Sequence, residues 1–227
     1  NGDEVTDGTD PLDDCSFVSA SITVAITSAS DCDGDGVTNF DELADGTDPL
    51  DSCSFDLSNA TVAQSASWIA ADCDGDGVTN GDELTDGTDP LDNCSFVLAS
   101  AGIAPDASWN AADCDGDGVT NGDEVADGTD PLDDCSFITG SITLAVTSTS
   151  DCDGDGVTNS DEAADGTDPF DPCSFVLASA SVAPDAAWDA ADCDGDGVTN
   201  GDEITGGNDP LDPCDPNQPS GYTGYDA

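Results

Sequence analysis

Residues 31–42 have the sequence DCDGDGVTNFDE, and the same stretch recurs four more times with only its tenth residue changed. Aspartates occupy positions 1, 3 and 5, and glycine, asparagine and glutamate occupy positions 6, 9 and 12. The alternation brings three carboxylates toward one point, the glycine allows a sharp turn, and the longer glutamate can close the shell with both oxygens. A hard cation of calcium's size accepts about six to eight oxygen ligands, so the pattern predicts a calcium-binding loop.

The five loops supply equivalent ligands, and the backbone carbonyl of the valine at position 7 belongs to each set. Magnesium fits this set less well, since it demands a tighter octahedron and keeps water. The predicted calcium ligands are Asp31, Asp33, Asp35, Val37, Asn39 and Glu42; Asp72, Asp74, Asp76, Val78, Asn80 and Glu83; Asp113, Asp115, Asp117, Val119, Asn121 and Glu124; Asp151, Asp153, Asp155, Val157, Asn159 and Glu162; and Asp192, Asp194, Asp196, Val198, Asn200 and Glu203.

A second motif follows every loop. It is Gly-Thr-Asp-Pro after four loops and Gly-Asn-Asp-Pro after the fifth. Its aspartate could complete the shell of the neighbouring ion or take part in a second site. Alternatively, it caps backbone N–H groups in an ordinary turn before proline. We expect metal contact from these aspartates, which are Asp48, Asp89, Asp130, Asp168 and Asp209.

The chain contains 52 aspartates and glutamates and no lysine, arginine or histidine, which gives a formal charge of −52. Its carboxylates must therefore be solvated, hydrogen-bonded to backbone N–H groups or paired with bound cations. Nucleic acid and anionic membrane surfaces are excluded as partners because both repel this charge. No apolar run approaches the roughly 20 residues of a membrane span. An enzyme is not expected, because the chain lacks an imidazole base and a cationic clamp.

The motifs divide the chain into an array of repeats. Because Asn1–Glu4 matches the second half of a loop, we interpret the chain as a fragment or processed form of a longer array. The expected divisions are a partial calcium repeat with a short insert (1–30), five repeats (31–71, 72–112, 113–150, 151–191 and 192–214) and a C-terminal tail (215–227).

An insert bounded by two cysteines lies between each turn motif and the next loop. The short inserts alternate polar and β-branched residues at Ser21–Ile26 and Ser141–Val146, which predicts strands. In a long insert, Pro105-Asp106 predicts a turn between two strands. Each insert is therefore expected to form a small β-hairpin. The long inserts also share a tryptophan that is expected to fill a small local core, namely Trp68, Trp109 and Trp188.

Eleven cysteines without a Cys-x-x-Cys pair favour disulfides over a zinc site, and disulfides indicate an oxidising compartment. Pairing across each insert, as in Cys15–Cys32, would staple the base of the insert and leave Cys214 over, and we prefer it. Pairing across each calcium loop, as in Cys32–Cys53, has a constant spacing of 21 residues and leaves Cys15 over. The sequence leaves both arrangements open.

Only Leu43-Ala44 separate Glu42 from the next Asp-Gly-Thr-Asp-Pro, which is too little for a normal exiting helix of an EF-hand or a dockerin. Asp-rich loops joined by Gly-Thr-Asp-Pro resemble instead the thrombospondin type 3 repeat in its bacterial form. The resemblance runs from Asn1 to Cys214, and the inserts interrupt the usual direct run of loops. This interrupted form is similar to repeats in large secreted surface proteins of Bacteroidetes-type bacteria. The resemblance implies calcium-dependent folding, an extracellular location, and spacer or adhesion roles.

We therefore expect a mostly irregular tandem-repeat rod, solenoid-like or ladder-like, with short β-hairpin inserts and little helix, stabilised by calcium and disulfides. The leading hypothesis is an extracellular structural protein, secreted or on the cell surface. It would act as a rigid rod, spacer or filament and would associate head to tail. The alternative is an adhesin stalk or binding module whose inserts contact glycan or a partner surface.

Overall fold

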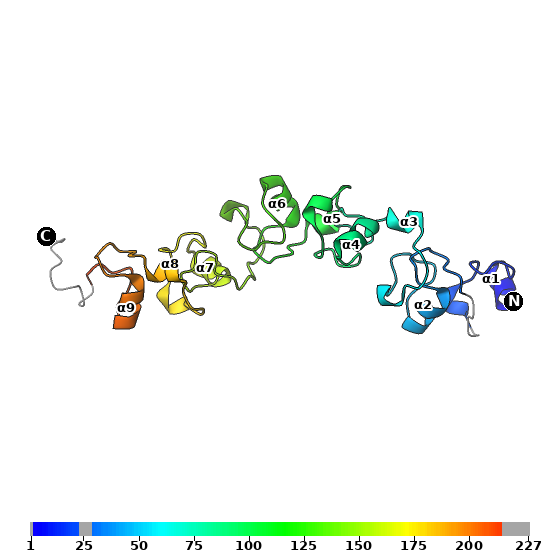
Figure 1. The fold of residues 1–227 in the computed structure, drawn as a ribbon, viewed down its shortest axis with the longest axis horizontal. Helices are drawn as coiled ribbons and strands as arrows, with labels where there is room; N and C mark the ends of the chain where they lie inside the picture. The colour runs from blue at the N-terminus through cyan, green and yellow to red at the C-terminus, as the bar shows by residue number, and fades with distance from the viewer. Residues whose placement is uncertain (1, 23–28, 215–227) are drawn as a thin grey trace. The chain divides into compact units, whose positions relative to one another are not determined.

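The computed structural model describes residues 2–22 and 29–214. The chain divides into two compact units, Asn1–Trp109 and Asn110–Ala227, and short helices alternate with irregular backbone in both (Figure 1). The calcium loops, the turn motifs and the inserts recur in both units, so one repeat explains the local structure of the others.

The helices are short throughout the described residues. Up to the unit boundary they are α1 (Gly2–Asp7), η1 (Ser19–Ser21), α2 (Asn39–Asp45), η2 (Leu57–Asn59), α3 (Ala66–Ile69), α4 (Asn80–Asp86), η3 (Leu98–Ser100) and α5 (Ala107–Asn110), where η marks a 3-10 helix. The remaining ones are α6 (Asn121–Asp127), η4 (Thr139–Ser141), α7 (Asn159–Asp165), η5 (Leu177–Ser179), α8 (Ala186–Asp189) and α9 (Asn200–Gly206).

Each complete calcium loop runs directly into a helix of seven residues. In α2 the Thr38 side chain accepts the Asp41 N–H at 3.3 Å and caps the first turn. Asp41 and Glu42 lie in that turn, where negative charge suits the helix dipole. Gly46 ends the helix in the left-handed region, with φ of 86°. The helix spans only about two turns, as the short spacing after Glu42 predicts.

The inserts are not β-hairpins, and this prediction was wrong. No strand occurs within residues 2–22 and 29–214. Every insert begins with a 3-10 helix, and the long inserts add a four-residue α-helix. At Ser141–Val146 the N–H groups of Thr143 and Leu144 both donate to the Gly118 carbonyl, at 2.9 Å. The insert's donors therefore bind the calcium loop rather than a second strand. The equivalent stretch Ser21–Ile26 falls largely on 23–28, outside the described residues.

Each long insert packs on the calcium loop that precedes it. The N–H groups of Thr61 and Val62 donate to the Gly36 carbonyl, at 2.9 and 3.1 Å. Trp68 packs in a cluster with Phe55 and Val37, the valine of that loop. The two other long inserts have equivalent clusters, which confirms the expected tryptophan cores: Val78, Phe96 and Trp109, and Val157, Phe175 and Trp188.

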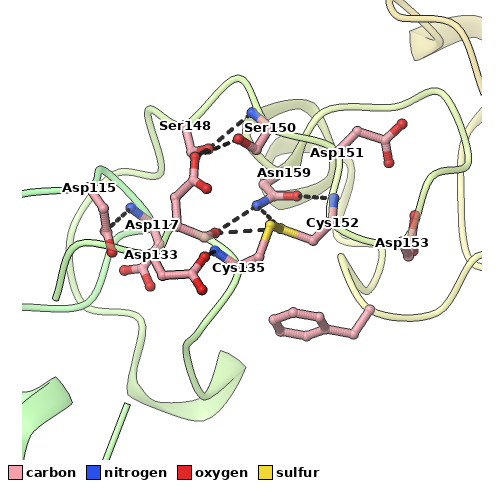
Figure 2. The surroundings of a disulfide bond; sticks show 12 residues. Asp115, Asp117, Asp133, Cys135, Ser148, Ser150, Asp151, Cys152, Asp153 and Asn159 are labelled. Atoms are coloured by element: carbon pink, nitrogen blue, oxygen red, sulfur yellow. Dashed lines mark hydrogen bonds between the residues drawn. A yellow bond between two sulfur atoms is a disulfide. The ribbon is translucent and has the colours of Figure 1, made fainter. Parts of the chain in front are cut away.

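The third repeat has no tryptophan, and a polar cluster lies near its disulfide. The hydroxyls of Ser148 and Ser150 donate to the Asp134 carboxylate. Figure 2 shows both serines in the surroundings of the Cys135–Cys152 bond. The buried apolar side chains of this repeat are Val119 and Phe137.

The disulfides cross the inserts, as the preferred arrangement predicts. The bonds are Cys15–Cys32, Cys53–Cys73, Cys135–Cys152 and Cys173–Cys193. Cys94 and Cys114 are disulfide-bonded as well. Cys214 is free and exposed. The alternative pairing across the calcium loops was wrong, because Cys32 is bonded to Cys15 rather than to Cys53. Each of these four bonds ties the two ends of an insert together, at the entrance to the next loop.

Candidate metal centre

The aspartate at position 1 shapes the loop with both carboxylate oxygens. Asp31 Oδ1 accepts the Gly34 N–H at 2.7 Å, and Oδ2 accepts the Gly36 N–H at 3.1 Å. Both glycines have positive φ, at 84° and 97°, so the loop bends around the carboxylate. In four loops, one oxygen from each of three aspartates lies within 4.8 Å of the others: Asp31, Asp33 and Asp35; Asp72, Asp74 and Asp76; Asp113, Asp115 and Asp117; and Asp151, Asp153 and Asp155.

The aspartates at positions 3 and 5 each use one oxygen for the backbone. Asp33 Oδ1 accepts the Asp35 N–H at 3.4 Å, and Asp35 Oδ1 accepts the Val37 N–H at 2.8 Å. The second oxygen of each carboxylate is buried and has no hydrogen-bond partner. The same holds for Asp74, Asp76, Asp115, Asp117, Asp153 and Asp155, and for Oδ2 of Asp194. These oxygens converge without a donor to satisfy them.

The glutamate at position 12 is buried against the aspartates. Glu42 is 0% exposed, and neither of its carboxylate oxygens has a hydrogen-bond partner. Both oxygens of Glu83 and Glu124, and Oε2 of Glu162, are also buried without a hydrogen-bond partner. An unsatisfied buried polar atom costs about 1–3 kcal/mol, and more if it is charged. The clustering of these unpartnered carboxylate oxygens fits the ligand shell of a bound cation.

The electrostatics of the centre agree with this geometry. Burial, together with the charges of the neighbouring aspartates, raises the pKa of Glu42 to about 8. The same causes raise the pKa of Asp33 to about 6. The equivalent glutamates Glu83, Glu124 and Glu162 have their pKa raised to about 8, with burial as the largest cause. A bound cation would favour the ionised carboxylates and offset the repulsion between them.

The asparagine at position 9 faces the cysteine at position 2. Asn159 Oδ1 accepts the Cys152 N–H at 3.2 Å, and its Nδ2 donates to Cys152 Sγ at 2.9 Å, as Figure 2 shows. Asn39 and Cys32 have the same arrangement, at 3.1 and 3.0 Å. The amide therefore braces the start of the loop against its end. Metal ligation by the five asparagines stays a prediction.

The aspartates of the Gly-Thr-Asp-Pro motif cap the turn. Asp48 Oδ1 accepts the Leu50 N–H at 3.2 Å, and the Asp48 N–H donates to Ser54 Oγ at 3.1 Å. The Asp48 charge also contributes to the raised pKa of Glu42, and Asp89 and Asp130 contribute likewise at Glu83 and Glu124. These carboxylates lie within electrostatic reach of the metal centres, and direct contact with an ion stays a prediction.

The fifth loop has the same residues in a more solvated setting. Asp192 is exposed and Val198 is half-buried, whereas Val37 is fully buried. Burial raises the pKa of Asp194 in this loop as well. The same donor set therefore occurs at all five positions, with less enclosure at the last.

Sequence reasoning missed the residues that seat the insert on the loop. Asp185 caps α8 by accepting the N–H groups of Ala187 and Trp188, at 2.8 and 2.7 Å. Its own N–H donates to the Gly154 carbonyl at 2.9 Å. The available signal was the aspartate two residues before a helix-compatible Ala-Trp, which is a helix N-cap pattern rather than a turn between strands.

The model of the bacterial TSP3 repeat family matches residues 1–14, 31–52, 72–93, 113–134, 151–172 and 192–213, more than half of the chain. The chain belongs to the bacterial TSP3 repeat family. Each match to a complete loop covers that loop and the turn motif after it, and leaves the inserts outside. Comparison with curated proteins and with solved structures gave no match. None of the described helices is both long and apolar enough to cross a membrane.

The TSP3 repeats and the aspartate clusters make this a calcium-binding tandem-repeat protein with disulfides. The family model and the donor geometry point to the same loops. The family matches end before each insert. The packing of the inserts on the loops is therefore seen in the structure and not in the family match.

Proposed function

We propose that this TSP3 array is an extracellular structural protein in which calcium ions hold consecutive repeats in a rigid rod or spacer. The observation that carries the proposal is the set of buried carboxylate oxygens without hydrogen-bond partners, repeated in every loop. A chain with no positive side chain has no internal group that could neutralise them. Calcium accepts this number and type of oxygen ligand.

In the proposed site the aspartates at positions 3 and 5 and the glutamate at position 12 offer their unpartnered oxygens to the ion. In the first loop these are Asp33, Asp35 and Glu42. Asp31 orients the loop through Gly34 and Gly36 while it contributes charge. The Val37 carbonyl supplies a neutral ligand, and Asn39 is assigned the bracing role its hydrogen bonds show. Calcium, when bound, supplies the positive charge that lets all these carboxylates ionise together.

The ion also organises the insert. The glycine carbonyls at positions 4 and 6 accept N–H groups from the insert, as Gly34 does from Ser65 at 2.8 Å. A loop that loses its ion loses the geometry of those carbonyls, because clustered carboxylates repel. The insert would then lose its backbone anchor and its contact with the loop valine. Folding of each repeat is therefore linked to metal binding.

Secretion is proposed from the disulfides and the family, since disulfides persist in oxidising compartments. A structural rather than enzymatic role follows from the residue types, because calcium ligation accounts for the clustered carboxylates. Head-to-tail association into a filament and placement on the cell surface stay predictions of the same proposal.

Tryptophan fluorescence during calcium removal tests the proposal. Trp68, Trp109 and Trp188 are nearly fully buried, so chelation should shift their emission to longer wavelength as the inserts undock. Protease sites should open in the inserts at the same calcium concentration. Calcium should restore both signals, and an equal concentration of magnesium should not. An emission wavelength and a cleavage rate that do not change when calcium is chelated at pH 7.5 would contradict the proposal.

A further inference from the structure

A groove lies between the insert after the first complete loop and the turn after the second. Its volume is about 550 Å³. Phe55, Leu57 and Leu91 supply its apolar surface, and Asp56 and Asp89 supply two carboxylates. Leu91 is 43% exposed, although it sits between two structured elements. The groove is separate from the carboxylate clusters of the calcium loops, although Phe55 also belongs to the Trp68 core and Asp89 is an expected calcium ligand.

Another repeat of the same chain has an aromatic side chain at the position equivalent to this groove. Phe170 occupies the turn position that Leu91 occupies two repeats earlier, and Phe137 is the equivalent of Phe55. The rings of Phe137 and Phe170 pack with centroids 4.7 Å apart and planes inclined at 46°. An aromatic ring against the insert phenylalanine is therefore an arrangement that this architecture accommodates.

The carboxylates at the groove indicate the charge of a molecule that would bind there. Asp56 is exposed, and its Oδ1 accepts the Ser58 N–H at 2.9 Å and the Ser58 hydroxyl at 2.7 Å. These bonds lower the pKa of Asp56, so the carboxylate is ionised at neutral pH. The whole chain has a charge of −52 and no lysine, arginine or histidine, so a balancing side chain must come from another molecule.

We propose that this groove binds a basic segment of another protein, in which an aromatic residue is flanked by lysine or arginine. The ring would lie on Phe55, Leu57 and Leu91, and the cations would face Asp56 and Asp89. An acidic surface steers such a partner and selects against acidic ones. Asp89 is also an expected calcium ligand, so Asp56 is the carboxylate that the test isolates, and the groove must be tested in the folded, calcium-loaded chain.

Equilibrium dialysis of the full chain in calcium, with a labelled peptide that contains Lys-Phe-Lys, tests the proposal. Leucine also occupies the turn position at Leu12, Leu50, Leu132 and Leu211, so the experiment counts bound peptides rather than assuming one. Leu91→Phe fills the groove with the ring that the chain itself uses at Phe170, and should reduce the count by one. Phe170→Leu opens the equivalent place and should raise the count by one. Neither substitution changes the charge.

Two further measurements separate the groove from general attraction to an acidic protein. Asp56→Asn keeps an oxygen to cap Ser58 but removes the charge, and should weaken binding at this site about three- to tenfold. A Lys-Ser-Lys peptide should bind at least tenfold more weakly than the Lys-Phe-Lys peptide. Equal counts in Leu91→Phe, Phe170→Leu and the parent chain would overturn the proposal. So would equal binding of the two peptides, or displacement of the peptide by a neutral oligosaccharide.

Discussion

The backbone carbonyl of Trp68 accepts a hydrogen bond from the side-chain amide of Asn80, at 3.1 Å. Trp68 belongs to the insert that packs on Val37 of the first complete loop, and Asn80 belongs to the second loop. Asn80 also accepts the Cys73 N–H on its amide oxygen, at 3.1 Å. The insert is therefore bound to the loop before it and to the loop after it. Trp188 and Asn200 repeat the relationship at 3.0 Å.

Asn80→Ala should uncouple the first insert from the second loop. The change leaves the half-buried Cys73 N–H without this partner, at a cost of about 1–3 kcal/mol. It also removes one of the donors to the Trp68 carbonyl, which keeps the Ala71 N–H at 3.0 Å. Hydrogen exchange in calcium should therefore rise in α3 and at the start of the second loop. Asn59→Ala is the control, because Asn59 makes one exposed hydrogen bond to Asp45. Exchange that rises equally in both variants would argue against the bridge.

Glu83→Gln should remove one calcium ion and leave the others. The substitution keeps the size of a fully buried side chain but takes one carboxylate from the second centre. Native mass spectrometry in calcium should show one ion fewer than in the parent chain. Asp86→Asn, at an exposed position of the same helix, should keep the full number. Loss of all the ions from Glu83→Gln would show that the repeats do not bind independently.

Gly77→Ala should undock the second insert. A Cβ there would lie 2.9 Å from the Ile103 carbonyl oxygen and 3.1 Å from Pro105 Cγ. Gly87 has a similar φ of 80° but nothing within 4 Å of a Cβ, so Gly87→Ala measures the backbone strain alone. We expect about 1–2 kcal/mol for Gly87→Ala and about 1–3 kcal/mol more for Gly77→Ala. Faster exchange of the Ile103 amide in Gly77→Ala alone is the decisive sign, and equal exchange would contradict the packing.

Acidification should weaken calcium binding. The pKa of Glu42, Glu83, Glu124 and Glu162 is raised to about 8 in the ion-free fold, above the ordinary 4.5. The ion-free fold therefore binds more protons than the unfolded chain. These glutamates leave the stability of the ion-free fold intact below about pH 4.5, and their ionisation destabilises that fold as pH rises through about 8. Calcium must displace those protons, so affinity should rise between pH 6 and pH 8. Calorimetry in two buffers of different ionisation enthalpy should detect proton release, and a constant affinity would contradict the buried carboxylates.

The clustering of the loop carboxylates could be predicted from sequence because its signal is strictly local. Asp31 to Glu42 form one loop, so spacing alone places the donors together. The repeat favoured the observed disulfides as well, since an insert that starts at Cys53 and ends at Cys73 leaves and re-enters the array at one place. The constant spacing of 21 residues across the loops kept the other pairing open.

The inserts could not be predicted in the same way, because their hydrogen-bond partners lie in the preceding loop. The alternation at Ser141–Val146 is typical of a strand, yet Thr143 and Leu144 donate to Gly118. No local pattern shows that a glycine carbonyl more than twenty residues earlier is the acceptor. The hydrogen bonds between Asn39 and Cys32 were equally hidden, since the spacing places an amide at this position without showing which groups it contacts.

The central claim is that the buried carboxylates of the five loops are calcium sites, and isothermal titration calorimetry of the decalcified chain at pH 7.5 tests it most directly. The account predicts at least five calcium ions bound per chain with dissociation constants below about 1 mM, the weak end of the range for extracellular modules. A variant with all five glutamates replaced by glutamine, at positions 42, 83, 124, 162 and 203, should lose these sites. Heats that fit no discrete sites, or that are identical in the parent chain and the variant, would contradict it.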